Sequence, residues 1–253
     1  MDPVTVLYED DEVLVVNKPA GLVVHADGRT EEPTLVDWLL EKYPAIQGVG
    51  EAIKVQSSKL KAQSEDRGGD DDEVIIERSG IVHRLDRETS GAIVIAKTRE
   101  SYLHLKRQFQ DREVHKKYHL FVWGEMKTER GTIDRPIGKS PNDFRQWSAQ
   151  RGAKGVMREA VTWYKVLARG HGISFIEAQP QTGRTHQIRV HFKAIGNPVV
   201  GDKLYAPTKR TALGFERTAL HARSIKFMGR GGKEIEVVAP YPDDFTHALE
   251  LLK

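Results

Sequence analysis

Residues 79–98 read SGIVHRLDRETSGAIVIAKT, a charged segment inside an apolar stretch. Ile81 and Val82 precede the charges, and residues 92–96 (AIVIA) follow them. β-Branched flanks of this kind are typical of strands buried in a domain core. The stretch therefore predicts two pieces of core strand joined by a polar turn, HRLDRETSG (83–91), that carries two arginines and two carboxylates.

Asp86 is the candidate reactive group of this turn. A lone Asp in a turn usually serves as a capping or turn residue. Here Arg84 and Arg87 flank the carboxylate closely, and their charges would hold it ionised. The apolar flanks would leave the turn partly desolvated, and residues 89–91 (TSG) would pin its backbone. An ionised, oriented carboxylate in a partly dry site acts as a nucleophile or as a general base, so we expect one of these two roles.

Composition excludes several classes of protein. The chain has 253 residues and no cysteine, so neither disulfides nor thiolate chemistry is available, and a cytoplasmic location is expected. The N-terminus lacks the basic segment and apolar core of a signal peptide. No run approaches the ~18 apolar residues that span a bilayer, so no membrane is expected as a partner.

Charge is distributed unevenly along the chain. Residues 1–80 hold 8 Lys or Arg against 18 Asp or Glu, whereas residues 81–253 hold 31 against 18. A basic body of this size attracts a polyanion, and nucleic acid is the usual one. A solvated basic surface without a partner is about equally consistent with the charge alone.

Hydrophobic periodicity predicts more strands than helices. Strands are expected within 5–26 and over 114–124, 159–168, 173–179, 219–227 and 234–240, and helices over 34–43, from Thr98 through Phe109, and over 185–196. The segment 131–157 contains Pro136, Pro141, Gly152 and Gly155 and is expected to be rich in loops. Residues 47–77 lose apolar content and include QSEDRGGDDDE (63–73), which predicts a mobile acidic insertion. The pattern indicates the α+β class, in a single domain over 1–253.

Several other chemistries lack their sequence signals. His186 and His191 are five residues apart, which puts them on different faces of a helix, unlike the zinc-binding HExxH pattern. His83 and Asp86 have no obvious third ligand, so no metal site is predicted. Neither a Walker loop nor a GxGxxG follows a strand, so no nucleotide cofactor is expected. Ser90 lacks the G-x-S-x-G context of a nucleophilic serine.

Several motifs occur in order along the chain. They are HRLDRETSG followed by AKT, VHKKY…VWG, TGRTHQIRVH…GNPVVGDKLY and LHA, with VLYEDDEVLVVNKPAGLVVH before them and EAVTWYKVL ahead of the third. Together they resemble the RluA-type family of RNA pseudouridine synthases from about residue 5 to about residue 245, with 47–77 as the main gap. The resemblance implies an α+β fold with a bent mixed, mostly antiparallel sheet, flanking helices and a central catalytic cleft. It implies isomerisation of uridine to pseudouridine in ribosomal RNA, or alternatively in tRNA. Many members begin with an S4-type RNA-binding domain, and we expect none here.

The resemblance also implies roles for individual residues. Asp86 would be the nucleophile, and Arg84 would push the target nucleotide out of its stack and occupy the space it leaves. Tyr118 would pack on the flipped uracil and is a candidate for proton transfer, while Arg189 would pair with Asp86. The residues expected to shape the pocket are His83, Leu85, Thr89, Ser90, Gly91, Arg184, His186 and Ile188.

This chemistry agrees with the residues. Extruding the base costs ~a few kcal/mol, and stacking on an aromatic ring such as Tyr118 returns ~1–3 kcal/mol. The reaction needs no redox step or energy input, so no cofactor is expected. Candidates for phosphate contact are Lys106, Arg107, Arg112, Lys116, Lys117, Arg145 and Arg151, and Trp147 is expected to meet RNA. We expect a monomer. A non-catalytic RNA-binding protein of the same fold and a metal-dependent nuclease using His83 and Asp86 remain the alternatives.

Overall fold

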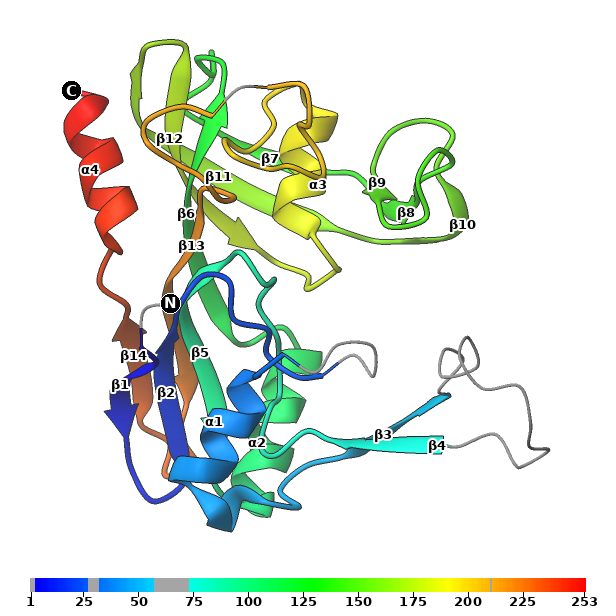
Figure 1. Ribbon diagram of the computed structural model, residues 1–253, viewed down its shortest axis with the longest axis vertical. Helices are drawn as coiled ribbons and strands as arrows, with labels where there is room; N and C mark the ends of the chain where they lie inside the picture. The colour runs from blue at the N-terminus through cyan, green and yellow to red at the C-terminus, as the bar shows by residue number, and fades with distance from the viewer. Residues whose placement is uncertain (1–2, 27–31, 57–72, 210) are drawn as a thin grey trace.

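One bent sheet runs through the whole molecule (Figure 1). The computed structural model describes residues 3–26, 32–56, 73–209 and 211–253. Within them, nine strands form the main sheet in the order β1-β2-β5-β13-β6-β12-β11-β7, with β14 paired to β13. The strands are β1 (Thr5–Glu9), β2 (Val13–Lys18), β5 (Ser90–Ala96), β6 (His115–Trp123), β7 (Arg130–Asp134), β11 (Val161–Gly170), β12 (Ile173–Pro180), β13 (Leu220–Met228) and β14 (Glu234–Val238).

Only one pair in this sheet is parallel. β5 pairs with β13 through Ser90↔His221 and Gly91↔Ala222, while the other pairs are antiparallel. Gly91 has φ +114, and a Cβ there would overlap the carbonyl oxygen of Ala222. A glycine is therefore required where these two strands pair. The predicted α+β class with a mixed, mostly antiparallel sheet is confirmed.

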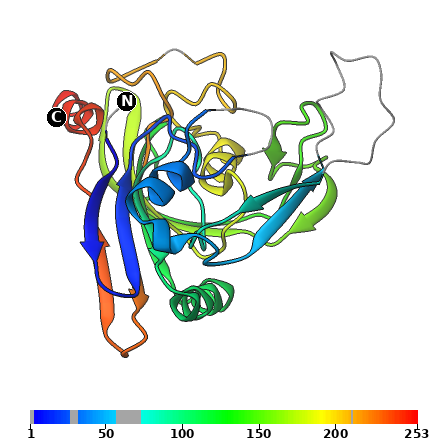
Figure 2. The same ribbon diagram turned by 60° about the horizontal axis from the view of Figure 1, so that its bottom comes forward.

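Four α-helices cover the sheet in the described part of the chain: α1 (Leu35–Lys42), α2 (Arg99–Gln110), α3 (Gln187–Ala194) and α4 (Asp243–Leu251), with a 3₁₀ turn at Pro44–Ile46. α1 and α2 begin at threonine caps, Thr34 and Thr98, each with a reciprocal capping box. In two views α4 lies on the opposite side of the molecule from α3 (Figures 1 and 2). Sequence analysis missed α4, although Asp243 and Asp244 in its first turn are a recognisable start signal.

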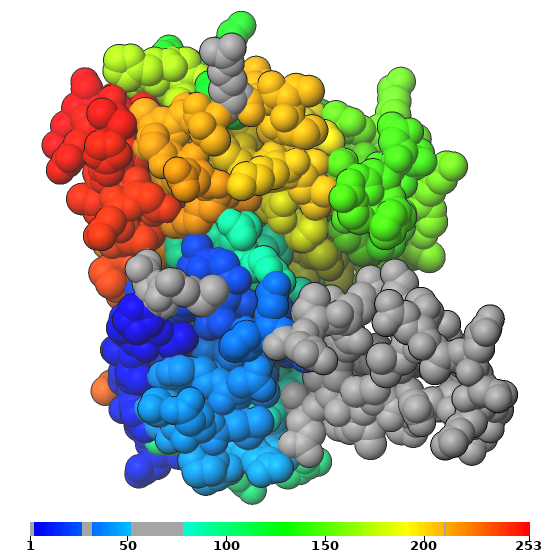
Figure 3. Space-filling model, viewed as in Figure 1, coloured from blue at the N-terminus to red at the C-terminus, as the bar shows by residue number. Residues whose placement is uncertain are grey.

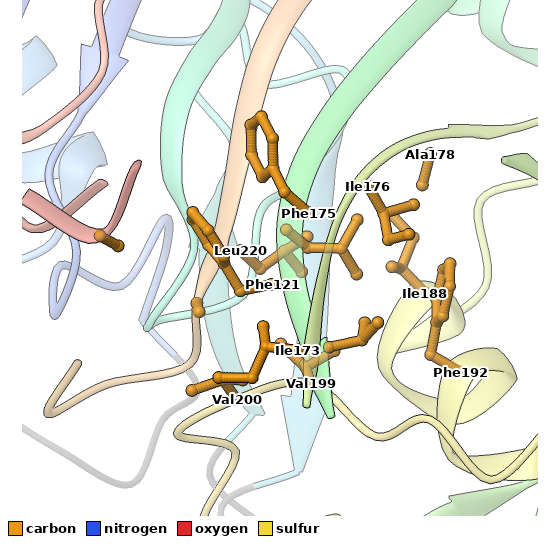
Figure 4. Packing of buried hydrophobic residues seen from close by; sticks show 14 of the residues in the cluster. Phe121, Ile173, Phe175, Ile176, Ala178, Ile188, Phe192, Val199, Val200 and Leu220 are labelled. Atoms are coloured by element: carbon orange, nitrogen blue, oxygen red, sulfur yellow. The ribbon is translucent and has the colours of Figure 1, made fainter. Parts of the chain in front are cut away.

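The upper half of the molecule has an aromatic core. Phe121, Phe175, Phe215 and Phe245 pack together in it, and Figure 4 shows the first two beside the aliphatic side chains of β12 and α3. The lower half packs α1 and the segment before β5 against β2 and β5. Tyr118 on β6 contacts the cores of both halves and so lies at their junction.

Several predicted segments differ in the structure. The 131–157 segment is rich in loops, as expected, but it also contains short strands: β7 adds to the main sheet, and β8 (Ile137–Lys139), β9 (Trp147–Ser148) and β10 (Lys154–Arg158) form a three-stranded sheet. Pro136, Pro141 and Gly152 lie between these strands, which are too short to carry much periodicity. The acidic insertion at 47–77 contains a two-stranded antiparallel sheet, β3 (Ala52–Gln56) with β4 (Glu73–Glu77), and residues 57–72 lie outside the described residues. Both small sheets project to the same side of the molecule (Figures 1 and 2).

Ile81 and Val82, at the start of the 79–98 stretch, do not form the expected strand. Ile81 forms only an isolated bridge with Ile95. The chain then leaves the sheet, and the N–H of Val94 donates instead to Nε2 of His83 at 3.1 Å. In the space-filling view the segment ahead of β5, in teal, lies at the waist between the two halves (Figure 3).

Candidate active site

A cavity of about 470 Å³ lies where three segments of the chain meet. One is the turn before β5, one runs from the end of α2 into β6, and one connects β12 to α3. Asp86, Tyr118 and Arg189 each come from a different segment, and all three line the cavity. The structure thus brings together the three residues to which the resemblance gives catalytic roles.

Asp86 is held by one guanidinium. Nη1 of Arg189 donates to Oδ2 of Asp86 at 3.1 Å, and the Asp86 side chain is 21% exposed. Arg87 does not serve this purpose, because it turns away to pair with Glu32 at 2.6 Å. The expectation that the flanking arginines jointly hold Asp86 ionised is therefore wrong for Arg87.

A second carboxylate, missed by sequence analysis, completes the Arg189 site. Nε and Nη2 of Arg189 donate to the two oxygens of Asp202 at 2.7 and 2.9 Å. Asp202 is fully buried, and its Oδ1 also accepts the backbone N–H of Tyr205 at 2.9 Å. Asp202 belongs to the GDKLY motif, which carried no predicted role for it. A bidentate pair fixes the plane of the guanidinium and leaves only Nη1 for Asp86.

Electrostatics keep Arg189 charged. Burial by itself lowers the pKa of Arg189, but the hydrogen bonds and charges of Asp202 and Asp86 outweigh it and raise the pKa above its usual range. Ile188, the preceding residue, packs into the aromatic core (Figure 4). Helix α3 is thereby anchored with Arg189 directed at the cavity.

Tyr118 is a neutral phenol at the base of the cavity. Burial, followed by the negative charge of Asp86, raises the pKa of Tyr118 well above its usual value. Its hydroxyl therefore stays protonated at neutral pH. The ring is available as an apolar surface, since it lines the cavity and rests on the cores of both halves.

His186 faces the other oxygen of Asp86. It is the N-terminal cap of α3 in a left-handed conformation, φ +56, and its Nε2 lies 3.9 Å from Oδ1 of Asp86. The Tyr205 hydroxyl accepts the N–H of Trp147 at 3.0 Å and lies 2.8 Å from Nδ1 of His186. Because that hydroxyl already accepts one bond, we assign its own proton to Nδ1, which leaves the His186 hydrogen on Nε2 toward Asp86. Burial lowers the pKa of His186, so the ring is neutral.

A buried lysine and a half-buried arginine hold the turn that carries Asp86. Nζ of Lys18 donates to the carbonyl oxygen of Arg87 at 3.1 Å, and Nη1 of Arg217 donates to that of Glu88 at 3.0 Å. Arg217 is itself fixed by a bidentate pair with Asp244 of α4, at 2.7 and 3.0 Å. Neither Lys18 nor Arg217 was singled out from the sequence, because their role depends on contacts with a distant segment.

The predicted pocket-shaping residues divide into two groups. His83, Leu85, Thr89, Arg184, His186 and Ile188 line the cavity. Ser90 and Gly91 lie behind it in β5, where Ser90 bonds to Nδ1 of His221 at 2.9 Å. Arg84 lines the cavity with an exposed side chain. Trp147, expected to meet RNA, is half-buried under Nζ of Lys139 at 3.9 Å from the ring centre.

Two further observations concern the described residues only. They contain no group of three or more His, Cys, Asp or Glu positioned to hold a metal ion. None of their helices is both long and apolar enough to cross a membrane.

Comparisons with known proteins agree on one family. A family model described as RNA pseudouridylate synthase matches residues 12–194. The chain is 36% identical to an uncharacterized RNA pseudouridine synthase of Synechocystis over 252 residues, 99% of this chain and 69% of that protein. It is 35% identical to the ribosomal large subunit pseudouridine synthase D of Xanthomonas campestris, over 99% of this chain and 70% of that protein. The solved structure of human RNA Pseudouridylate Synthase Domain Containing 4 matches with a TM-score of 0.69 at 25% identity, over 98% of this chain and 92% of that one.

Proposed function

This chain belongs to the RNA pseudouridylate synthase family, and we propose that it modifies uridine in ribosomal RNA with Asp86 as its nucleophile. As an RNA pseudouridine synthase it is an isomerase. The observation that carries the role of Asp86 is its position in the cavity, bonded to Arg189 and close to Tyr118. In a protein that only binds RNA, a carboxylate in the binding pocket would repel the RNA phosphates and would serve no purpose. This arrangement supports catalysis over binding alone.

The cavity suits an extruded nucleoside. Its volume of about 470 Å³ lies in the range of small-molecule sites. A uridine that leaves its stack costs ~a few kcal/mol, and packing against the Tyr118 ring offsets part of that cost. Arg84, exposed at the cavity, is positioned to occupy the space that the base vacates.

The isomerisation exchanges one bond of the base for another. The N1–C1′ bond breaks and its electrons stay on the uracil, the base turns, and C5 bonds to C1′. The proton of C5 leaves and a proton is gained at N1, so the product is an isomer of the substrate. The Asp86 carboxylate either attacks C1′, forming an ester that C5 of the turned base displaces, or removes the C2′ proton to give a glycal and returns that proton when C5 bonds to C1′.

Arg189, His186 and Tyr118 support these steps. The Arg189 guanidinium donates to Oδ2 of Asp86 and orients the carboxylate, and the N–H of His186 is directed toward Oδ1. Because burial and the charge of Asp86 raise its pKa, the Tyr118 phenol stays protonated and serves as a hydrogen-bond donor to the detached uracil.

Ribosomal RNA is the substrate class favoured by the relatives. Proteins of Xanthomonas campestris, Xylella fastidiosa and Zymomonas mobilis that match 99% of this chain are named ribosomal large subunit pseudouridine synthase D. Their identities to this chain are 35%, 34% and 32%.

A pseudouridine map of total RNA tests the proposal. The map is compared between cells with the gene, cells without it, and cells that express Asp86→Asn. We expect large-subunit ribosomal RNA to lose pseudouridine at one or a few positions without the gene, and only the wild-type chain to restore it. Loss confined to tRNA would overturn the ribosomal assignment, and restoration by Asp86→Asn would overturn the role of Asp86.

A further inference from the structure

Lys116 is a cation in the wall of the cavity. It has no role in the mechanism proposed above. It precedes Tyr118 by two residues on β6, and both side chains line the cavity. Alternate residues of a strand leave the same face, which explains why the two share the cavity. Lys117, named above as a candidate for phosphate contact, lies between them on the other face; it does not line the cavity, and its Nζ lies 3.7 Å from Glu236 of β14.

Aromatic rings, and not a carboxylate, position Lys116. Its Nζ lies 5.5 Å from the centre of the Phe109 ring, which stacks on His83 at 4.7 Å. His83 is itself fixed by the Val94 N–H, and burial lowers its pKa to about 3, so this stack adds no charge. Within the described residues the Lys116 side chain makes no hydrogen bond and no ion pair.

Two other cations of the cavity have acidic partners, whereas Arg84 and Arg184 form no ion pair within the described residues. Arg189 pairs with Asp86 and Asp202, and Arg112 pairs with Glu159 at 3.0 Å. A half-buried ammonium without a counter-ion is costly, and burial lowers the pKa of Lys116 to about 8. It nevertheless remains mainly charged at neutral pH. Such a group binds an incoming anion strongly, because part of its hydration has already been removed.

We propose that Lys116 binds a phosphodiester of the RNA beside the extruded uridine, while Tyr118 packs on the base. Two residues of strand span ~6.6 Å, comparable to the separation of a pyrimidine ring from the phosphate of its own nucleotide. The contact fixes the sugar–phosphate so that C1′ meets Asp86. It reads no base, so it contributes equally to every sequence. The inference rests on the proposed function only in requiring that the nucleotide enter this cavity.

Salt-dependent binding of a short oligouridylate separates this role from a purely structural one. The full chain is compared as wild type, Lys116→Met, Lys116→Arg and the matched control Lys117→Met, with fluorescence anisotropy over a series of KCl concentrations. Loss of one phosphate contact lowers the slope of log Kd against log salt by about 0.7 for single-stranded RNA. We expect this change, with about tenfold weaker binding at low salt, for Lys116→Met alone, and recovery of the slope in Lys116→Arg.

The outcomes are decisive either way. A wild-type slope in Lys116→Met, an equal change in Lys117→Met, or no binding of oligouridylate by the wild-type chain would overturn the proposal. A thermal unfolding midpoint for each variant identifies a misfolded one, and Lys116→Arg retains the charge if Lys116→Met is misfolded. The probe carries no ribosomal sequence, so the result holds even if ribosomal RNA is not the substrate.

Discussion

Asp86 accepts a hydrogen bond from a residue 103 positions away in the chain, Arg189. Asp86→Asn preserves the size of the side chain and removes the nucleophilic oxygen. We expect product formation to fall by a factor on the order of 10³ or more, and the Kd for RNA to change less than about threefold. Release of tritium from C5-labelled uridine in a ribosomal transcript measures the first, and anisotropy measures the second.

Glu88→Gln is the matched control, because Glu88 lies in the same turn but its side chain does not line the cavity. It should retain near wild-type turnover. Turnover in Asp86→Asn comparable to that of Glu88→Gln would contradict the assignment of the nucleophile.

Tyr205 does not face the cavity reaction directly but acts through its bond to His186. Tyr205→Phe keeps the ring, whose centre lies 4.9 Å from Cζ of Arg189, and removes the hydroxyl that bonds to Nδ1 of His186. We expect kcat to fall about tenfold, or ~1.4 kcal/mol, with little change in KM, because the His186 N–H is no longer directed at Asp86. Tyr43→Phe, which loses an exposed hydroxyl bond to Glu9, should be unchanged. Equal kcat values for the two variants would show that the bond to His186 does not matter.

At the scale of elements, the turn before β5 is fastened from behind by α4 through Arg217. Arg217→Met leaves the carbonyl oxygen of Glu88 and the carboxylate of Asp244 without their donor. We expect the free energy of unfolding to drop by about 2–3 kcal/mol in urea denaturation. Arg230→Met removes an exposed pair with Glu12 and should cost no more than ~1 kcal/mol. A similar loss in both variants would argue against the brace.

Prediction at this scale succeeded where an element is long and periodic. The strands at 114–124, 173–179 and 219–227 and the helix from Thr98 agree with β6, β12, β13 and α2 within a few residues. The short strands within 131–157 were not predicted, because two- to five-residue strands are stabilised by their partners and leave little pattern of their own. The prediction of a strand at Ile81 and Val82 was wrong for a related reason. Their apolar side chains pack in the core, as in a buried strand, but their backbone turns toward the cavity.

For the whole molecule, the cavity lies where the two halves of one sheet meet. Arg112, after α2, and Glu159, before β11, form an exposed ion pair beside the cavity, which Arg112 lines. Glu159→Gln frees Arg112 for RNA, so we expect about two- to fivefold tighter binding at low salt, less at high salt, and a change in stability below ~1 kcal/mol. Glu129→Gln, which breaks the Arg169 pair, removes the same charge from residues that do not line the cavity. Equal gains in both variants would reduce the effect to net charge.

The sequence by itself determined the α+β class, the family resemblance and the choice of Asp86, Tyr118 and Arg189. Class follows from periodicity along short stretches, and the motifs are contiguous, so both are readable without folding. Only the tertiary structure decided that Asp202 orients Arg189, that Tyr205 orients His186, that Arg217 braces the turn and that Lys116 has no acidic partner among the described residues. The first three are contacts between residues that lie 13, 19 and 129 positions apart in the chain. Side-chain contacts of this kind depend on how the two halves of the sheet pack, which local sequence pattern does not specify.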